Sequence, residues 1–124
     1  MYEYERDFVM RQIKELSRFL ANMLFQKDIP MLEIVQADGE VTGEGLLYLQ
    51  LKQMISGGDI NKAENLLFEE INESGDSDRL YGLALQFYDD LQALSDEYLE
   101  ACNFSREEIL DGLKEITEIF ANKN

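Results

Sequence analysis

The sequence contains no histidine and only one cysteine and one proline among its 124 residues. Without histidine, the chain can form neither a Ser-His-Asp nor a Cys-His catalytic group, and it can offer no imidazole ligand to zinc. The lone Cys102 has no second cysteine to pair with, so nothing in the sequence indicates an oxidising compartment. These absences exclude most common enzyme classes and leave carboxylates as the only plausible catalytic groups.

Basic residues and long apolar runs are also scarce. Lys and Arg number 11 against 26 Asp and Glu, which gives a formal net charge of -15 and an isoelectric point near 4.2. Such a field repels nucleic acids and anionic membranes. No run approaches the roughly 18 apolar residues of a membrane span, and charged residues interrupt the start of the chain. We therefore expect a cytoplasmic protein with no nucleic-acid partner, no membrane partner and no cofactor.

Apolar residues nevertheless make up 45% of the chain, which is far above the level of a disordered acidic tail. The length suits one domain. Apolar side chains recur at steps of three and four residues, as on one face of an α-helix. We predict a single all-α domain over residues 1–124 with about five helices. Its parts are an N-terminal helix within 1–30, a loop over 28–43, a helical hairpin over 44–73 and a second helical pair over 77–121.

The predicted hairpin is marked by the turn Gly57-Gly58-Asp59 between two amphipathic segments. Glycine adopts the left-handed conformation of a helix C-cap at little cost, and the small Ala63 allows the next helix to pack closely. The spacing from Gly58 to Ala63 and Leu67 resembles half of a tetratricopeptide unit. The match covers about a fifth of the chain, and the 34-residue period does not recur clearly. This resemblance implies antiparallel hairpins in a tetratricopeptide-like, right-handed helical array.

Two other segments leave alternatives open. Residues 28–43 are predicted to be an ordered loop, although Asp38-Gly39 is also a suitable turn for a small hairpin. The helix after Ser77 carries apolar residues at alternating steps of four and three until Ala101, which predicts one continuous helix. Ser95 is alternatively an N-cap that divides it. The last helix opens with a capping box formed by Ser105 and Glu108.

Three segments together resemble a family of short bacterial proteins that is classed only as a domain of unknown function. They are YERDFVMRQIKELSRFLANMLF (residues 4–25), GDINKAENLLFEEI (residues 58–71) and NFSREEILDGL (residues 103–113). The resemblance covers most of the chain. It implies a bacterial, helical, tetratricopeptide-like protein, and it supplies no catalytic or ligand residues.

Acidic pairs at i, i+3 spacing are the only candidates for chemistry. Two of them lie on neighbouring predicted helices and resemble the acidic motifs of all-helical nucleotide pyrophosphohydrolases; their residues are Glu97, Glu100, Glu108 and Asp111. Helical bundles can hold Mg²⁺ between such pairs. With 26 acids in 124 positions, however, about five such pairs arise by chance. A solvated acidic face is therefore the main interpretation, and a carboxylate-based, metal-dependent hydrolase is the alternative.

The excess negative charge lies entirely in residues 31–124, because basic and acidic residues cancel within residues 1–30. The N-terminal helix can thus approach a second molecule without electrostatic repulsion. Its apolar stripe is widened by Phe8, Phe19 and Leu24, which we take as interface candidates. We therefore predict a non-catalytic protein-protein interaction or self-association module, with a protein partner or a homodimer formed through this helix. The alternative is that the helix simply completes the core of the monomer.

Overall fold

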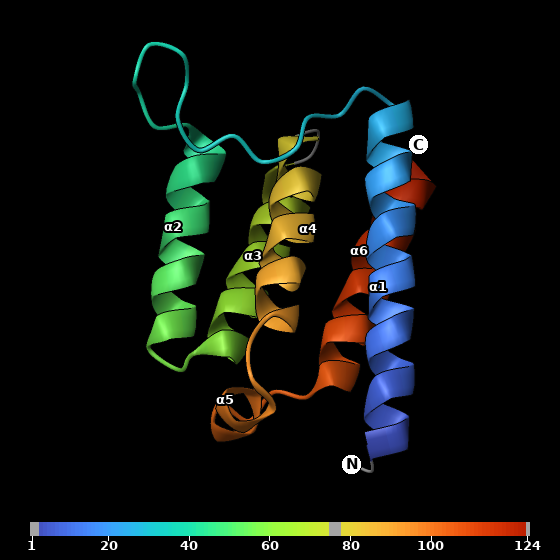
Figure 1. Cartoon of the computed structure of the whole chain (residues 1–124). Coiled ribbons are helices and arrows are strands. Elements are labelled where there is room, and N and C mark those ends of the chain that lie inside the picture. The colour runs from blue at the N-terminus through green and yellow to red at the C-terminus, as the bar shows by residue number, and fades with distance from the viewer. Residues whose placement is uncertain (1–2, 75–77, 124) are drawn as a thin grey trace.

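The computed structural model describes residues 3–74 and 78–123, which form six α-helices and, within those ranges, no strand (Figure 1). The helices are α1 (Glu3–Gln26), α2 (Gly43–Ser56), α3 (Ile60–Ser74), α4 (Arg79–Gln92), α5 (Asp96–Ala101) and α6 (Arg106–Lys123). The predicted all-α class is confirmed. None of these helices is both long enough and apolar enough to serve as a membrane span.

Five of the helices form two layers. In Figure 1, α2, α4 and α1 stand side by side in front, and α3 and α6 lie behind them. α2 packs against α3 and α4, whereas α1 packs against α4 and α6. α2 and α3 are the antiparallel hairpin that the sequence predicted. The packing is that of a helical array with α2 at one end of the front layer and α1 at the other; the tetratricopeptide likeness stays a prediction.

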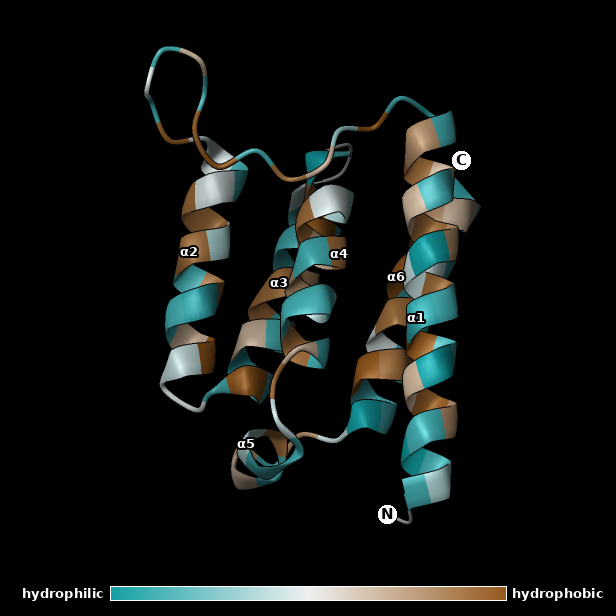
Figure 2. Cartoon of the chain, in the orientation of Figure 1, coloured by the Kyte–Doolittle hydropathy of each residue, from teal (hydrophilic) through white to brown (hydrophobic). Residues whose placement is uncertain are grey.

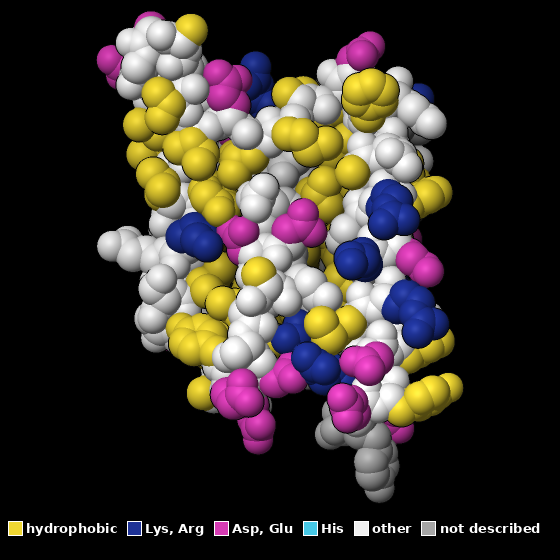
Figure 3. All heavy atoms as spheres, viewed as in Figure 1, with side chains coloured by type: hydrophobic (Ala, Val, Ile, Leu, Met, Phe, Trp, Pro, Cys, Tyr) yellow, Lys and Arg dark blue, Asp and Glu magenta, His cyan; other side chains and the backbone are white. Residues whose placement is uncertain are grey.

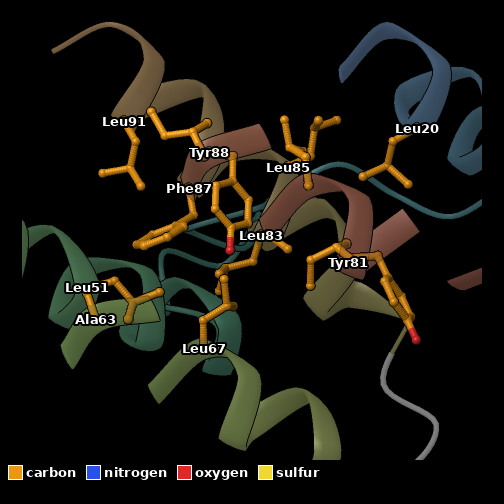
Figure 4. Packing of buried hydrophobic residues seen from close by; sticks show 14 of the residues in the cluster. Leu20, Leu51, Ala63, Leu67, Tyr81, Leu83, Leu85, Phe87, Tyr88 and Leu91 are labelled. Carbon is orange, nitrogen blue, oxygen red and sulfur yellow. The ribbon is translucent and has the colours of Figure 1, made fainter. Parts of the chain in front are cut away.

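α4 is the centre of the core because it packs against α1, α2 and α6. Its buried residues lie on every side of the helix; they are Leu80, Tyr81, Gly82, Leu83, Ala84, Leu85, Phe87, Tyr88 and Leu91. Figure 4 shows Leu51, Ala63 and Leu67 gathered below Phe87 and Tyr88. Along α1, by contrast, hydrophobic and hydrophilic segments alternate, as expected of a helix with one covered face (Figure 2).

The predicted continuous helix from after Ser77 to Ala101 is wrong, and the alternative N-cap at Ser95 is confirmed. α4 ends at Gln92, and the Ser95 hydroxyl accepts a hydrogen bond from the Tyr98 amide at 3.1 Å as α5 begins. Arg106 from α6 explains the break. Its buried guanidinium donates to the carbonyl oxygens of Gln92 and Leu94, at 3.1 and 2.9 Å, so the carbonyls at the end of α4 are satisfied outside a helix.

The loop between α1 and α2 lies directly against two helical glycines. A Cβ atom on Gly82 would lie 2.6 Å from the carbonyl oxygen of Pro30, and one on Gly45 would lie 2.6 Å from that of Ile34. The hydroxyl of Thr42 accepts from the Gly45 amide at 2.8 Å and caps α2. Because neither glycine has a side chain, the loop backbone can pack directly on α4 and on α2.

The segment is an ordered loop, as predicted, and one isolated bridge within it lies where the small-hairpin alternative placed its turn. Val35 and Val41 form an isolated antiparallel bridge, and the Glu40 amide donates to the Asp38 carboxylate at 2.9 Å. Gly39 has a φ of 90°, which favours glycine at this turn. The bridge places two valines beside each other at the start of α2.

The turn between α2 and α3 agrees with the sequence prediction. Gly58 has a φ of 85°, its amide donates to the Ile55 carbonyl, and the Asp59 amide donates to the Met54 carbonyl. This pattern is a Schellman C-cap. Ala63 is fully buried one turn into α3, as expected of the small residue at the close approach of the hairpin.

Candidate functional site

The structure does not bring the four predicted metal ligands together. All are exposed on α5 and α6; they are Glu97, Glu100, Glu108 and Asp111. Glu108 is engaged in the capping box, where its carboxylate accepts from the Ser105 amide at 2.7 Å. Across the described residues, no three His, Cys, Asp or Glu side chains gather closely enough to hold a metal ion. The proposed metal site is therefore not assembled by these side chains.

A groove of about 570 Å³ between α3 and α6 is the most acidic hollow described here. Its carboxylates are Glu64, Glu69, Glu108, Asp111 and Glu115, and no Lys or Arg lines it. A groove of this charge repels anionic substrates such as nucleotides. The groove is suited to a basic group and not to a phosphate group.

The groove is supported from inside by one partly buried hydrogen bond. The hydroxyl of Tyr88 on α4 donates to the Glu64 carboxylate on α3 at 2.6 Å. Burial raises the pKa of Glu64, and the negative charges of Glu108, Glu115 and Asp111 add to that rise, while the hydrogen bond from Tyr88 opposes it. Burial also raises the pKa of Tyr88, so the phenol stays protonated and acts as a donor. The pair holds α4 to α3 and offers no activated nucleophile.

Sequence reasoning missed this pair, although Gly112 is a signal for it. A Cβ atom on Gly112 would collide with the Tyr88 phenol, so α6 can pass Tyr88 only where it lacks a side chain. A glycine inside a helical period costs about 1 kcal/mol relative to alanine and commonly has a packing reason. The tyrosine that needs the space, however, lies 24 residues earlier in the chain.

A second pocket, of about 640 Å³, lies where α1 meets the joint between α4, α5 and α6. Arg6 and Arg106 approach the two oxygens of Asp96, with Nε to oxygen distances of 2.6 and 2.7 Å. The hydrogen bond from Arg106, with the positive charges of both arginines, lowers the pKa of Asp96. Both guanidinium groups face this carboxylate, so the cluster joins helices and is not a free anion-binding site.

The face of α1 that the sequence predicted as an interface is partly available. Phe8 and Phe19 are 49% and 55% exposed, and each lies in a shallow pocket along the seam with α6. Tyr4 adjoins Phe8 in the same pocket. Leu24 is 0% exposed and packs in the monomer core, so its selection as an interface residue was wrong. We name Tyr4, Phe8 and Phe19 the α1 face.

The opposite end of the array exposes an apolar surface that sequence reasoning did not identify. Leu46 and Leu49 of α2 are 60% and 48% exposed, and the bridged Val35 and Val41, which are 51% and 42% exposed, belong to the loop that leads into α2. We name these four residues the α2 edge patch. Figure 3 shows hydrophobic side chains gathered over α2 and the base of its loop.

Apart from Lys52, the residues along the outer face of α2 carry no charge. Leu46 and Leu49 share a pocket of about 490 Å³ with Gln50, Gln53 and Ser56. Lys52 also lines it, and its ammonium group lies 3.4 Å from the carboxylate of Asp90 on α4. The sequence does contain a signal for this surface. The apolar residues of α2 extend around most of the helix, whereas a helix with one buried face needs only a single apolar stripe.

Comparison with known proteins places the chain in a family. The family of unknown function DUF6483 matches residues 3–121, which is nearly the whole chain, so the protein belongs to DUF6483. This agrees with the uncharacterised domain that the three sequence segments indicated. No curated protein and no solved structure matches the chain.

Proposed function

We propose that this protein is a non-catalytic binding module that self-associates through the α1 face. The observation that carries the proposal is the half-exposure of two phenylalanines on one side of one helix. Phe8 and Phe19 are separated by 11 residues, or three helical turns, and lie within about 20° of each other around the helix axis. An aromatic ridge of this length suits packing against a second helix.

Charge supports a second copy as the partner of this face. Residues 1–30 carry equal numbers of basic and acidic side chains, so two α1 helices meet without net repulsion. Arg11, Lys14 and Arg18 lie exposed beside Glu15 on this helix. Two copies related by a twofold axis can therefore pair opposite charges around the phenylalanines.

The alternative of a metal-dependent hydrolase is not favoured by any described observation. Such an enzyme needs several carboxylates converging on one ion. The four candidates are exposed, no three of them gather, and Glu108 caps its own helix. We therefore propose binding and not catalysis.

Light scattering after gel filtration tests the self-association. At low micromolar concentration in 0.15 M salt, where the screening length is about 8 Å, we expect about twice the 14.4 kDa of one chain. Phe8→Glu and Phe19→Glu should each return the mass to that of a monomer, because each places a carboxylate in the apolar contact.

Phe25→Glu is the matched control. Phe25 is 79% exposed on the same helix, six residues after Phe19, which turns it about 120° away from the ridge. This variant should keep the dimer mass. A wild-type mass near 14.4 kDa, or a dimer that survives both ridge substitutions, would contradict the proposal.

A further inference from the structure

We propose that the α2 edge patch binds a partner protein through an amphipathic helix that carries Lys or Arg at one end. This inference concerns a surface at the opposite end of the front layer from the α1 face. It does not depend on self-association. A helix bound here would take the next position in the row formed by α1, α4 and α2 (Figure 1).

α2 is covered on its inner side only. Leu51 and Ile55 are buried against the neighbouring helices, whereas Leu46 and Leu49 point away from them into solvent. α2 packs on α3 and α4, which lie on its inner side. The end of a helical array normally presents a polar outer face, and this end presents leucines. An apolar end face of this kind is typical of a surface that a further helix covers.

The exposed side chains of α2 are regularly spaced. Leu46, Leu49, Gln50 and Gln53 follow one another at steps of three, one and three residues, so they form a straight strip along α2. The glutamines are uncharged and can donate or accept hydrogen bonds. An amphipathic helix of a partner can place its apolar stripe on the two leucines and its polar margin on the two amides.

The charge of the neighbouring loop selects the chemistry of the partner. The loop that contributes Val35 and Val41 also carries Glu33, Asp38 and Glu40, all exposed, and no Lys or Arg occurs between residues 28 and 51. Figure 3 shows acidic side chains around this part of the surface. A helix whose end beside the loop carries Lys or Arg gains favourable electrostatic contacts there.

A second copy of this chain fits the patch less well. Its exposed basic row, Arg11, Lys14 and Arg18, lies on α1 beside Glu15, in a segment where basic and acidic residues cancel. In residues 31–124, six basic residues are dispersed among 21 acidic ones. Two α2 edges brought together would also bring two acidic loops into one assembly. The charge pattern therefore favours a different protein with a basic helix end.

Synthetic peptides test the proposal with the full chain. The probe is an 18-residue helical peptide with a leucine stripe and three lysines at one end, labelled for fluorescence anisotropy. Its partners in the test are the same peptide with three glutamates and a scrambled peptide of equal charge without the stripe. We expect the lysine peptide to bind at least about tenfold more tightly than either of them, and more weakly as salt rises.

Variants locate the binding site. Leu46→Gln with Leu49→Gln should weaken binding of the lysine peptide at least tenfold, and replacing the three loop carboxylates by amides should weaken it several-fold. The matched control is Glu69→Gln with Glu115→Gln, which neutralises the acidic groove between α3 and α6, the other surface that could attract a cationic peptide. This control should leave binding unchanged.

Several outcomes would overturn the inference. Equal binding of all three peptides, or absence of binding, removes the partner chemistry. Loss of binding only in the groove variant moves the site to α3 and α6. Assemblies larger than a dimer that disappear in the α2 variant make a second copy the occupant. The mass of the α2 variant also separates this proposal from the first, because a dimer formed by the α1 face should survive the change.

Discussion

The two ends of the front layer expose apolar side chains in different electrostatic surroundings. The α1 face carries aromatic residues among balanced basic and acidic side chains. The α2 edge patch carries aliphatic residues on a nearly uncharged helix, beside a loop with only acidic charges. A balanced surface tolerates its own copy, whereas a surface flanked by one sign of charge selects an opposite partner. In a chain with a net charge of -15, the local balance therefore matters more than the total.

The two ends are also held to the middle of the array by different means. At the α1 end, Arg6 and Arg106 meet at Asp96, which links α1, α5 and α6. At the α2 end, Tyr48 and Lys52 contact the Asp90 carboxylate of α4, Arg79 of α4 pairs with Glu44, and the loop packs its backbone on Gly45 and Gly82. Substitutions at these contacts test whether each end depends on polar or on steric complementarity.

The largest effect is expected at the polar joint. Arg106 is 6% exposed and donates to Asp96, Gln92 and Leu94. Arg106→Leu should lower the free energy of unfolding by about 3 kcal/mol, because buried carbonyl groups lose their donors. Urea unfolding measures the change. Arg79→Leu at the other end removes an ion pair in which the Arg79 side chain is 55% exposed, and it should cost less than about 1 kcal/mol. Equal losses would show that the two ends do not differ in this way.

A smaller effect is expected where the loop meets α2. Gly45→Ala places a Cβ atom within 3 Å of the Ile34 backbone, which cannot move as a flexible side chain does. We expect a loss of about 1 to 2 kcal/mol, after allowing for the better helix propensity of alanine. Gly43→Ala is the matched control, because that position has open space around it. Thermal melting of both variants should show Gly43→Ala unchanged or more stable, and a neutral Gly45→Ala would refute the close-packing argument.

Glu64 lies in the middle of the array, which serves as the reference for both ends. Burial raises the pKa of Glu64, so the folded protein binds this proton more tightly than the unfolded chain does. The stability that comes from this tighter proton binding is present at acid pH and is lost as the pH rises through the pKa of Glu64 in the folded protein. Glu64→Gln keeps an acceptor for Tyr88. It should raise the free energy of unfolding by on the order of 0.5 kcal/mol at pH 7 and leave it unchanged below about pH 4.

Urea unfolding between pH 4 and pH 8 measures this difference. Glu69→Gln is the control, since Glu69 lines the same groove but is exposed. A gain in Glu64→Gln that is independent of pH would contradict the assignment to this titration.

The smallest effect on stability is expected at the α2 edge patch itself. Leu46→Gln and Leu49→Gln replace exposed side chains and should change the free energy of unfolding by less than about 0.5 kcal/mol each. Leu51→Gln, two residues further along the same helix, buries a polar amide and should cost several times more. Similar losses for Leu49 and Leu51 would show that the patch belongs to the core and is not a free surface.

The features that the sequence determined by itself are local. Helical periods, the left-handed turn at Gly58 and the capping box of Ser105 and Glu108 depend on residues within a few positions of one another, and each was predicted correctly. The break at Ser95 was also visible, but only as an alternative. The heptad pattern continued across it, and the residue that stabilises the break, Arg106, lies on another helix.

Only the tertiary structure decided which apolar side chains are covered. Leu24 and Phe19 both extend the stripe of α1, yet Leu24 is buried and Phe19 is exposed, because α4 and α6 cover one part of the stripe and not the other. α2 is apolar on two sides, and its place at the end of the layer leaves Leu46 in solvent. Likewise, Tyr88 and Glu64 meet only because two separate helices pack together. Periodicity fixes the angle of a side chain around its own helix, whereas burial depends on the neighbouring helices that fill that direction.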